Sequence, residues 1–119
     1  MQQPLICENT ITSNPIGPGI VPAGGTVRGT GIDITWQNGP LGRGEGRTEP
    51  NGAFVEGVIL AALQRIEWYQ TACDRKFACR ENALAITKLE EALHWLNART
   101  NRREAAGTEG THKEDTRVA

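Results

Sequence analysis

The stretch RENALAITKLEEALHWLNAR (Arg80–Arg99) decides the fold, because it is the longest uninterrupted helical pattern in the chain. Its spacing predicts a helix that buries one face along a second helix. The apolar side chains that define this face recur four and three residues apart, at Ile86, Leu89, Leu93 and Leu96. Asn82 breaks the pattern, since it lies where the apolar row, extended one turn backward, would demand a hydrophobic residue. Such a polar group either bonds internally or points toward something other than the core.

A second helical pattern precedes this stretch and predicts a hairpin. We expect a helix to begin at Asn51, which follows Pro50 and is a competent N-cap. Leu60 and Leu63 lie on a different side from its main apolar row, so we expect two covered faces. That row comprises Val55, Ile59, Ala62, Ile66 and Tyr69. Thr71–Ala78 is then a short connection, which favours antiparallel helices.

The first fifty residues hold short strand patterns between glycines and prolines. Gly31–Gln37 alternates apolar and polar residues, as a strand with one buried face does. Gly19–Val21 and Thr26–Arg28 are shorter β-prone runs. The predicted fold class is therefore α+β, with a small N-terminal antiparallel β-sheet followed by an antiparallel two-helix hairpin.

Length and composition bound the architecture and the class of function. In 119 residues we expect a single domain, with a β-rich part over about 1–50, the hairpin over about 51–103 and a C-terminal tail over about 104–119. Aromatic residues make up only 5%, so we expect a partner subunit to complete the burial. The net charge of −1 argues against a general DNA or RNA binder. A membrane span and a signal peptide are both missing from the pattern, which predicts a cytoplasmic protein.

Motifs for catalysis or metal binding are also missing from the sequence. Cys7, Cys73 and Cys79 are an odd number of cysteines, which argues against a disulfide framework. Cys73 and Cys79 do not combine with His94 and His112 at the spacing of a zinc site, so we expect reduced structural thiols and no cofactor. Neither a Gly-x-Ser-x-Gly turn nor a His-Glu-x-x-His helix is present, and we expect no enzymatic activity.

The remaining features suit a binding module for a compact anionic ligand that carries flat bases. Aromatic rings stack on bases for about 1–3 kcal/mol each, and arginine forks hold phosphate. Leu41–Pro50 carries Arg43 and Arg47 among glycines, and is either a flexible solvated connection or a loop that approaches phosphate. Phe77 either plugs the end of the hairpin or stacks on a base. Gly107–His112 either frays or folds back as an anion-binding nest.

Four stretches resemble a known family of phage proteins. Phe77–Arg99 looks like the helical hairpin of the phage anti-CBASS and Thoeris anti-defence proteins. Three further stretches narrow the resemblance to Thoeris anti-defence proteins of the first type. They are Ile32–Arg43, Pro50–Glu56 and Gly107–His112, so the resemblance extends over about residues 30–112.

The resemblance implies a small β-sheet followed by two long helices, in homo-oligomers that are dimers or trimers of dimers. It implies a sponge for cyclic ADP-ribose isomers such as glycocyclic ADP-ribose, which TIR-domain enzymes of Thoeris make from NAD. The sponge would hold this signal without cleaving it. Some members of the family also hold cyclic oligonucleotides of CBASS at a separate site. The alternative function is a helical hairpin that docks on a host protein.

The resemblance also implies ligand contacts. Asn82 matches the asparagine of the Arg-Glu-Asn motif, and Arg99 matches the arginine that follows Trp-Leu-Asn-x. Tyr69 or Phe77 would supply an aromatic contact near the helix turn. Because Asn82 and Arg99 would lie ~25 Å apart along one helix, we expect a pocket shared between subunits. Further candidates for this pocket, or for the cyclic-oligonucleotide site, are Arg28, Trp36, Arg43 and Arg47.

Overall fold

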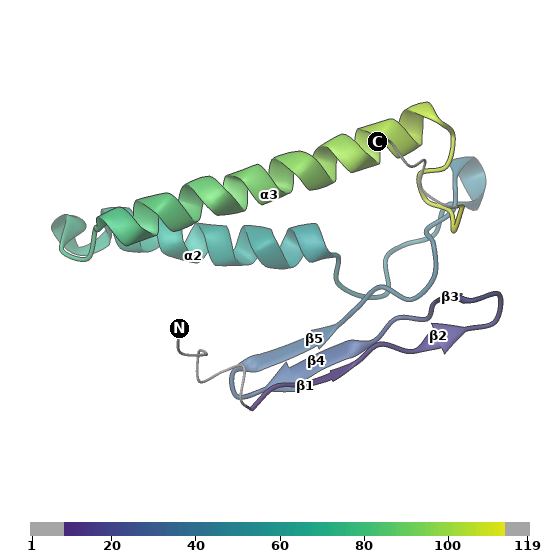
Figure 1. Ribbon diagram of the computed structural model, residues 1–119, viewed down its shortest axis with the longest axis horizontal. Helices are drawn as coiled ribbons and strands as arrows, with labels where there is room; N and C mark the ends of the chain where they lie inside the picture. Colours follow the sequence, from purple (N-terminus) through teal and green to yellow (C-terminus); the bar gives the residue numbers. More distant parts are fainter. Residues whose placement is uncertain (1–8, 114–119) are drawn as a thin grey trace. The chain divides into compact units, whose positions relative to one another are not determined.

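A computed structural model of the chain describes residues 9–113, which form two compact units (Figure 1). Among the described residues, the first unit comprises 9–54 and 108–113, and the second is Val55–Gly107. Cys7 and the chain end from Glu114 lie outside the described residues. The prediction that Cys7 is a structural thiol therefore stays a prediction.

Two small antiparallel sheets make up the strand structure described in the first unit. Strands β1, β4 and β5 form one sheet with β4 at its centre, and β2 pairs with β3 in the other. Their bounds are β1 Ile11–Ser13, β2 Ile16–Gly17, β3 Val21–Pro22, β4 Thr26–Gly29 and β5 Ile32–Thr35. Figure 1 shows β2 and β3 continuing into the longer sheet. The predicted antiparallel sheet is confirmed.

The strand boundaries reflect how strong each sequence pattern is. Along β5 half-buried and exposed side chains alternate as predicted for this strand, and β4 occupies the predicted run. The predicted strand Gly19–Val21 is wrong at its start, because Gly19 and Ile20 have positive φ angles of 82° and 57° and form a turn. Every residue of β1 is exposed. Burial therefore does not require apolar and polar residues to alternate along this strand, and the sequence shows no strand pattern there.

The predicted helix start at Asn51 is also wrong, because Asn51 is bound within the sheet unit. Its carboxamide accepts a hydrogen bond from the Asn38 N–H at 2.8 Å and donates one to the Asn38 carbonyl at 2.9 Å. Its own N–H donates to Gln37 Oε1 at 2.8 Å. The first long helix, α2, begins at Val55 instead.

The second unit is a helical hairpin in which α2 (Val55–Arg75) and α3 (Arg80–Ala105) lie side by side (Figure 1). Half-buried side chains on α3 follow the predicted spacing of four and three residues. They include Asn82 and the whole predicted apolar row, Ile86, Leu89, Leu93 and Leu96. The predicted second helix and its packed face are confirmed. In the described residues, neither helix is long and apolar enough to cross a membrane.

The predicted apolar row of the first helix is only partly right. Ile59 and Ile66 are half-buried as predicted, but they share their face with the buried Leu63 and the half-buried Gln70, and the predicted Ala62 is exposed. Leu63 is only 6% exposed, whereas Val55 and Tyr69, from the predicted row, are exposed. Both rows have the same spacing, so periodicity does not choose between them. The polar Gln70 hides the true row, since it occupies a position where an apolar residue is expected.

The change of direction between the helices falls inside the predicted connection Thr71–Ala78. Helical geometry is lost at Ala72, and Cys73, Asp74 and Arg75 have positive φ angles of 54°, 55° and 62°. For an L-residue the left-handed conformation costs roughly 1–2 kcal/mol, so this turn is strained. Neighbouring contacts must therefore hold its geometry.

Candidate functional site

Two predicted ligand residues come together at the turn of the hairpin. The Asn82 amide Nδ2 donates to the Phe77 carbonyl at 3.4 Å, and the Phe77 ring is 55% exposed. This exposure excludes the interpretation that Phe77 plugs the hairpin. The Lys76 ammonium lies 5.8 Å from the centre of that ring. An exposed ring close to a cation, on a residue whose carbonyl binds an amide side chain, matches the chemistry of a nucleotide, which has a flat base and a charged phosphate.

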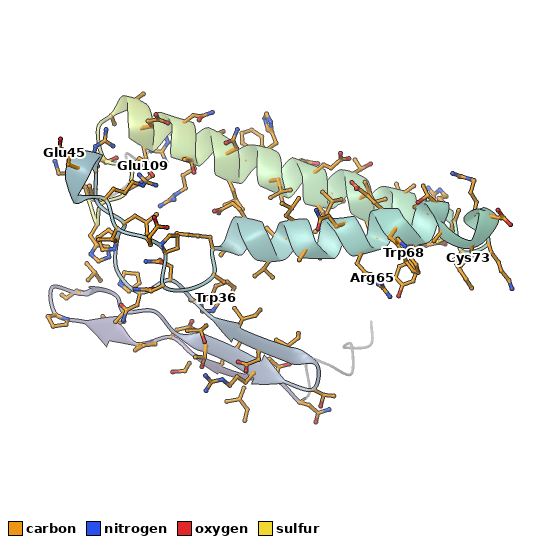
Figure 2. All side chains as sticks on the ribbon, turned by 180° about the vertical axis from the view of Figure 1, so that it is seen from behind. Trp36, Glu45, Arg65, Trp68, Cys73 and Glu109 are labelled. Atoms are coloured by element: carbon orange, nitrogen blue, oxygen red, sulfur yellow. The ribbon has the colours of Figure 1, made fainter. Side chains whose placement is uncertain are left out.

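Tyr69, on the last regular turns of α2, belongs to a cluster with Arg65 and Trp68. The Arg65 guanidinium lies 4.5 Å from the centre of the Trp68 ring and 5.0 Å from that of Tyr69. The two rings meet edge to face at 5.3 Å. Figure 2 shows Arg65 and Trp68 projecting from the same side of α2. The sequence reasoning missed Arg65, although its spacing of three and four residues from the rings was a usable signal.

Arg99 lies far along α3 from Asn82. The helix is continuous over Arg80–Ala105, so the two residues are separated by ~25 Å at 1.5 Å per residue. One chain therefore does not place both side chains on one small ligand. The sequence reasoning also missed Arg103, which is 7% exposed. Continuing the packed row of α3 forward by one heptad from Leu96 would have indicated this position.

In the first unit, Arg28 and Trp36 are held by the sheet. Arg28 Nε donates to Asp33 Oδ1 at 3.1 Å across neighbouring strands, where both side chains are exposed. Trp36 is half-buried and forms a parallel bridge with Ala53. A Cβ added to Gly52 would lie 2.5 Å from the Trp36 carbonyl oxygen, so only glycine allows this close approach. Arg28 therefore pairs with a carboxylate of its own sheet, and the Trp36 backbone lies against Gly52 and Ala53.

Arg43 and Arg47 meet at Glu109, and we call these three residues the Glu109 clasp. Arg47 Nη1 lies 2.8 Å from Glu109 Oε2, and Arg43 Nη1 donates to the Glu109 carbonyl at 3.0 Å. Next to them the Gly42 N–H donates to the Gly110 carbonyl at 2.8 Å. The short 3₁₀ helix η1 (Gly44–Gly46) lies between the two arginines in sequence. The glycine-rich loop is therefore fastened to the turn after α3 and is not a freely solvated connection.

Replacing Glu109 by glutamine is expected to lower the free energy of unfolding by up to about 1 kcal/mol, because the glutamine oxygen can still accept from Arg47 but no longer carries the charge that strengthens this partly exposed hydrogen bond. Glu45→Gln in η1 is the matched control, since Glu45 is not part of the clasp. Figure 2 labels both glutamates. Hydrogen exchange of the Gly42 amide should accelerate in Glu109→Gln only. Equal exchange in the two variants would contradict the clasp.

The described residues contain no cluster for a metal ion. Over residues 9–113, no three His, Cys, Asp or Glu side chains lie together in the arrangement that metal binding requires. Cys73 and Cys79 are free and exposed. Figure 2 shows Cys73 in the strained turn. The binding groups that this site offers are therefore rings, amides and cations.

Comparisons with known proteins cover most of these residues. The Acb2/Tad1 hairpin domain matches residues 29–101, which include Tyr69, Phe77, Asn82 and Arg99. Over 63 residues the chain is 52% identical to Thoeris anti-defense 1 of Bacillus phage SBSphiJ7. This alignment covers 53% of the chain and 42% of that relative, so the chain spans less than half of the relative's length. The hairpin, its packed face and the domain match agree with the resemblance seen in the sequence, and the chain belongs to the Acb2/Tad1 hairpin-domain family.

Proposed function

We propose that this protein is a phage anti-defence sponge that binds cyclic ADP-ribose isomers, in particular glycocyclic ADP-ribose, and holds them without cleavage. TIR-domain enzymes of Thoeris make this signal, and its capture would keep the effector inactive. The observation that supports the proposal most strongly is the domain match, which contains the exposed Phe77 and the Asn82 amide that donates to its carbonyl. The relative is named as a Thoeris anti-defense protein, and this name supports the proposal that the present protein also acts against Thoeris.

The side chains at the site suit the chemistry of this ligand. Phe77, or Tyr69 in the cluster with Arg65, offers a ring on which adenine can stack. Asn82 has both a donor and an acceptor for base or ribose groups. Arg99 offers a planar fork for the pyrophosphate, where charge-assisted hydrogen bonds are strongest.

The same groups support binding rather than turnover. Nucleophilic catalysis needs a nucleophile within hydrogen-bond reach of a base, and a third group to orient the base. A ring, an amide and a guanidinium do not make such a set. We therefore propose that the protein acts by affinity and stoichiometry, and that it is not an enzyme.

We further propose that the protein is a homo-oligomer, a dimer or a trimer of dimers, whose pockets are shared between copies. Among the described residues, Leu63 is the one apolar side chain that the chain itself buries. Large apolar side chains on both helices stay exposed, which favours a second copy as their cover. They include Val55, Leu60, Trp68, Leu84 and Trp95. A shared pocket also brings Asn82 of one copy to Arg99 of another.

Cyclic oligonucleotides of CBASS are a second ligand class that the resemblance implies. In the described structure Arg43 and Arg47 bind Glu109, and Arg28 binds Asp33. Phosphate would have to compete with these carboxylates for the same guanidinium groups. We therefore place glycocyclic ADP-ribose ahead of cyclic oligonucleotides as the ligand.

The proposal is tested with the product mixture of an activated TIR enzyme. The protein is added in excess, removed by filtration together with anything it holds, and then heated. We expect the signal to disappear from the filtrate and to return unchanged on heating. A modified nucleotide after heating would indicate an enzyme. A filtrate that keeps its signal would contradict the sponge and favour docking on a host protein.

A further inference from the structure

Gln70, at the end of α2, joins the two helices across the strained turn. Its side-chain oxygen accepts a hydrogen bond from the Cys79 N–H at 2.9 Å, and its Nε2 donates to the Cys79 carbonyl at 3.2 Å. One carboxamide thus binds both backbone polar groups of a single residue. We call this pair of hydrogen bonds the Gln70 clamp.

The clamp acts on the residue at which α3 begins. Cys79 is the N-cap of α3, and its own side chain makes no capping hydrogen bond. The Cys79 carbonyl also accepts the first helical hydrogen bond, from the Ala83 N–H at 3.2 Å. Because the N-cap determines where a helix starts, Gln70 fixes the start of α3 relative to the last regular turn of α2.

The turn between them does not hold this geometry by local preference. Cys73, Asp74 and Arg75 occupy the left-handed region, which L-residues without special support rarely adopt. Such a conformation persists when surrounding contacts over-determine it, and it is frequent at functional sites. The Gln70 clamp is a contact of this kind, since it spans the turn from end to end.

We propose that Gln70 is a positioning residue of the ligand site. Phe77 lies two residues before Cys79 and Asn82 lies three residues after it, and the Asn82 amide donates to the Phe77 carbonyl. Holding Cys79 therefore holds the ring and the amide at a set spacing before the ligand arrives. Preorganisation of this kind raises affinity because less order has to be created on binding. The inference rests on the proposed function, since it assigns Gln70 to the same pocket.

Gln70→Ala removes both hydrogen bonds of the clamp, and Gln64→Ala is the matched control on the same helix, where Gln64 is exposed. Gln70→Glu keeps an acceptor for the Cys79 N–H and loses the donor to the Cys79 carbonyl. Two quantities are measured at a temperature at which circular dichroism shows every variant folded. They are the Kd for glycocyclic ADP-ribose, by calorimetry, and hydrogen–deuterium exchange in peptides spanning residues 76–83.

We expect Gln70→Ala to weaken glycocyclic ADP-ribose binding about tenfold and to accelerate exchange of the Cys79 amide. Gln70→Glu should show an intermediate loss, and Gln64→Ala should match the unaltered protein. Leu63→Val, which loosens the packed face away from the turn, serves to separate positioning from stability. It should lower the melting temperature without changing the Kd.

Each contrary result has its own meaning. A Kd for Gln70→Ala equal to that of Gln64→Ala would overturn the positioning role. The positioning role would also be overturned if Leu63→Val lost as much affinity as Gln70→Ala, because the loss of binding would then follow from the loss of stability. If the unaltered protein binds no glycocyclic ADP-ribose, the proposed function fails. The exchange data then still decide whether Gln70 fixes the turn, and unchanged exchange in Gln70→Ala would overturn the clamp as well.

Discussion

Replacing Arg99 by alanine is expected to weaken the binding of glycocyclic ADP-ribose about 30-fold or more, because a charged hydrogen bond is worth about 2 kcal/mol. Arg99 is exposed on α3 in the single chain, so the melting temperature should change little. Lys88→Ala, on the same helix and away from the turn, is the matched control for the loss of one surface charge, because the Lys88 side chain is 76% exposed. Calorimetric titration of the three proteins measures the effect. Equal affinities for all three would remove Arg99 from the pocket.

Mixing two inactive variants tests whether the pocket is shared. Asn82→Ala and Arg99→Ala each damage every pocket of a homo-oligomer. If Asn82 and Arg99 come from different copies, a mixed dimer regenerates one intact pocket out of two. Statistical mixing should therefore restore about a quarter of the binding capacity. Restoration near zero, with subunit exchange verified by mass spectrometry, would contradict a pocket shared between copies.

Leu63→Ala is expected to have the largest effect on stability, lowering the free energy of unfolding by about 2–3 kcal/mol. Leu63 is 6% exposed on the packed face of α2, and the two-helix unit has few other buried contacts to absorb the loss. Ile11→Ala removes the same number of carbon atoms at a side chain of the sheet unit that is 76% exposed and is not among those that a second copy would cover. It should cost less than half as much. Urea denaturation at one fixed chain concentration compares them, and equal losses would contradict the packed face seen in the structure.

The predictability of the fold differs between the two helices. Arg80–Arg99 could be predicted in detail, because its large apolar residues, apart from Leu84 and Trp95, fall in one row. In α2 two rows have equal spacing, and the true one includes the polar Gln70. The helix start was missed because Asn51 is a good N-cap by residue type, yet its amide is already bound to Asn38. The hydrogen bonds to Asn38, thirteen residues earlier, thus outweigh the local preference of Asn51 for a helix N-cap.

The candidate site was predictable only where its residues are close in sequence. The turn, with Phe77 and Asn82, emerged from a short motif and its resemblance. The Glu109 clasp joins Arg47 to a residue 62 positions later, and no spacing rule predicts such a contact. The Gln70–Cys79 contact was missed for a different reason. The contact depends on the conformation of a turn whose left-handed residues are neither glycine nor asparagine. The sequence therefore contains no residue type that would predict this turn.

The amount of intact signal held per chain, followed over time, tests the central claim most directly. The protein is incubated with excess glycocyclic ADP-ribose, recovered by ultrafiltration and heated, and the released nucleotide is quantified by mass spectrometry. We predict a plateau at no more than about one molecule per chain in a symmetric assembly, independent of incubation time, with the nucleotide chemically unchanged. Continued loss of signal beyond that plateau, accompanied by a modified nucleotide, would show turnover and contradict sequestration.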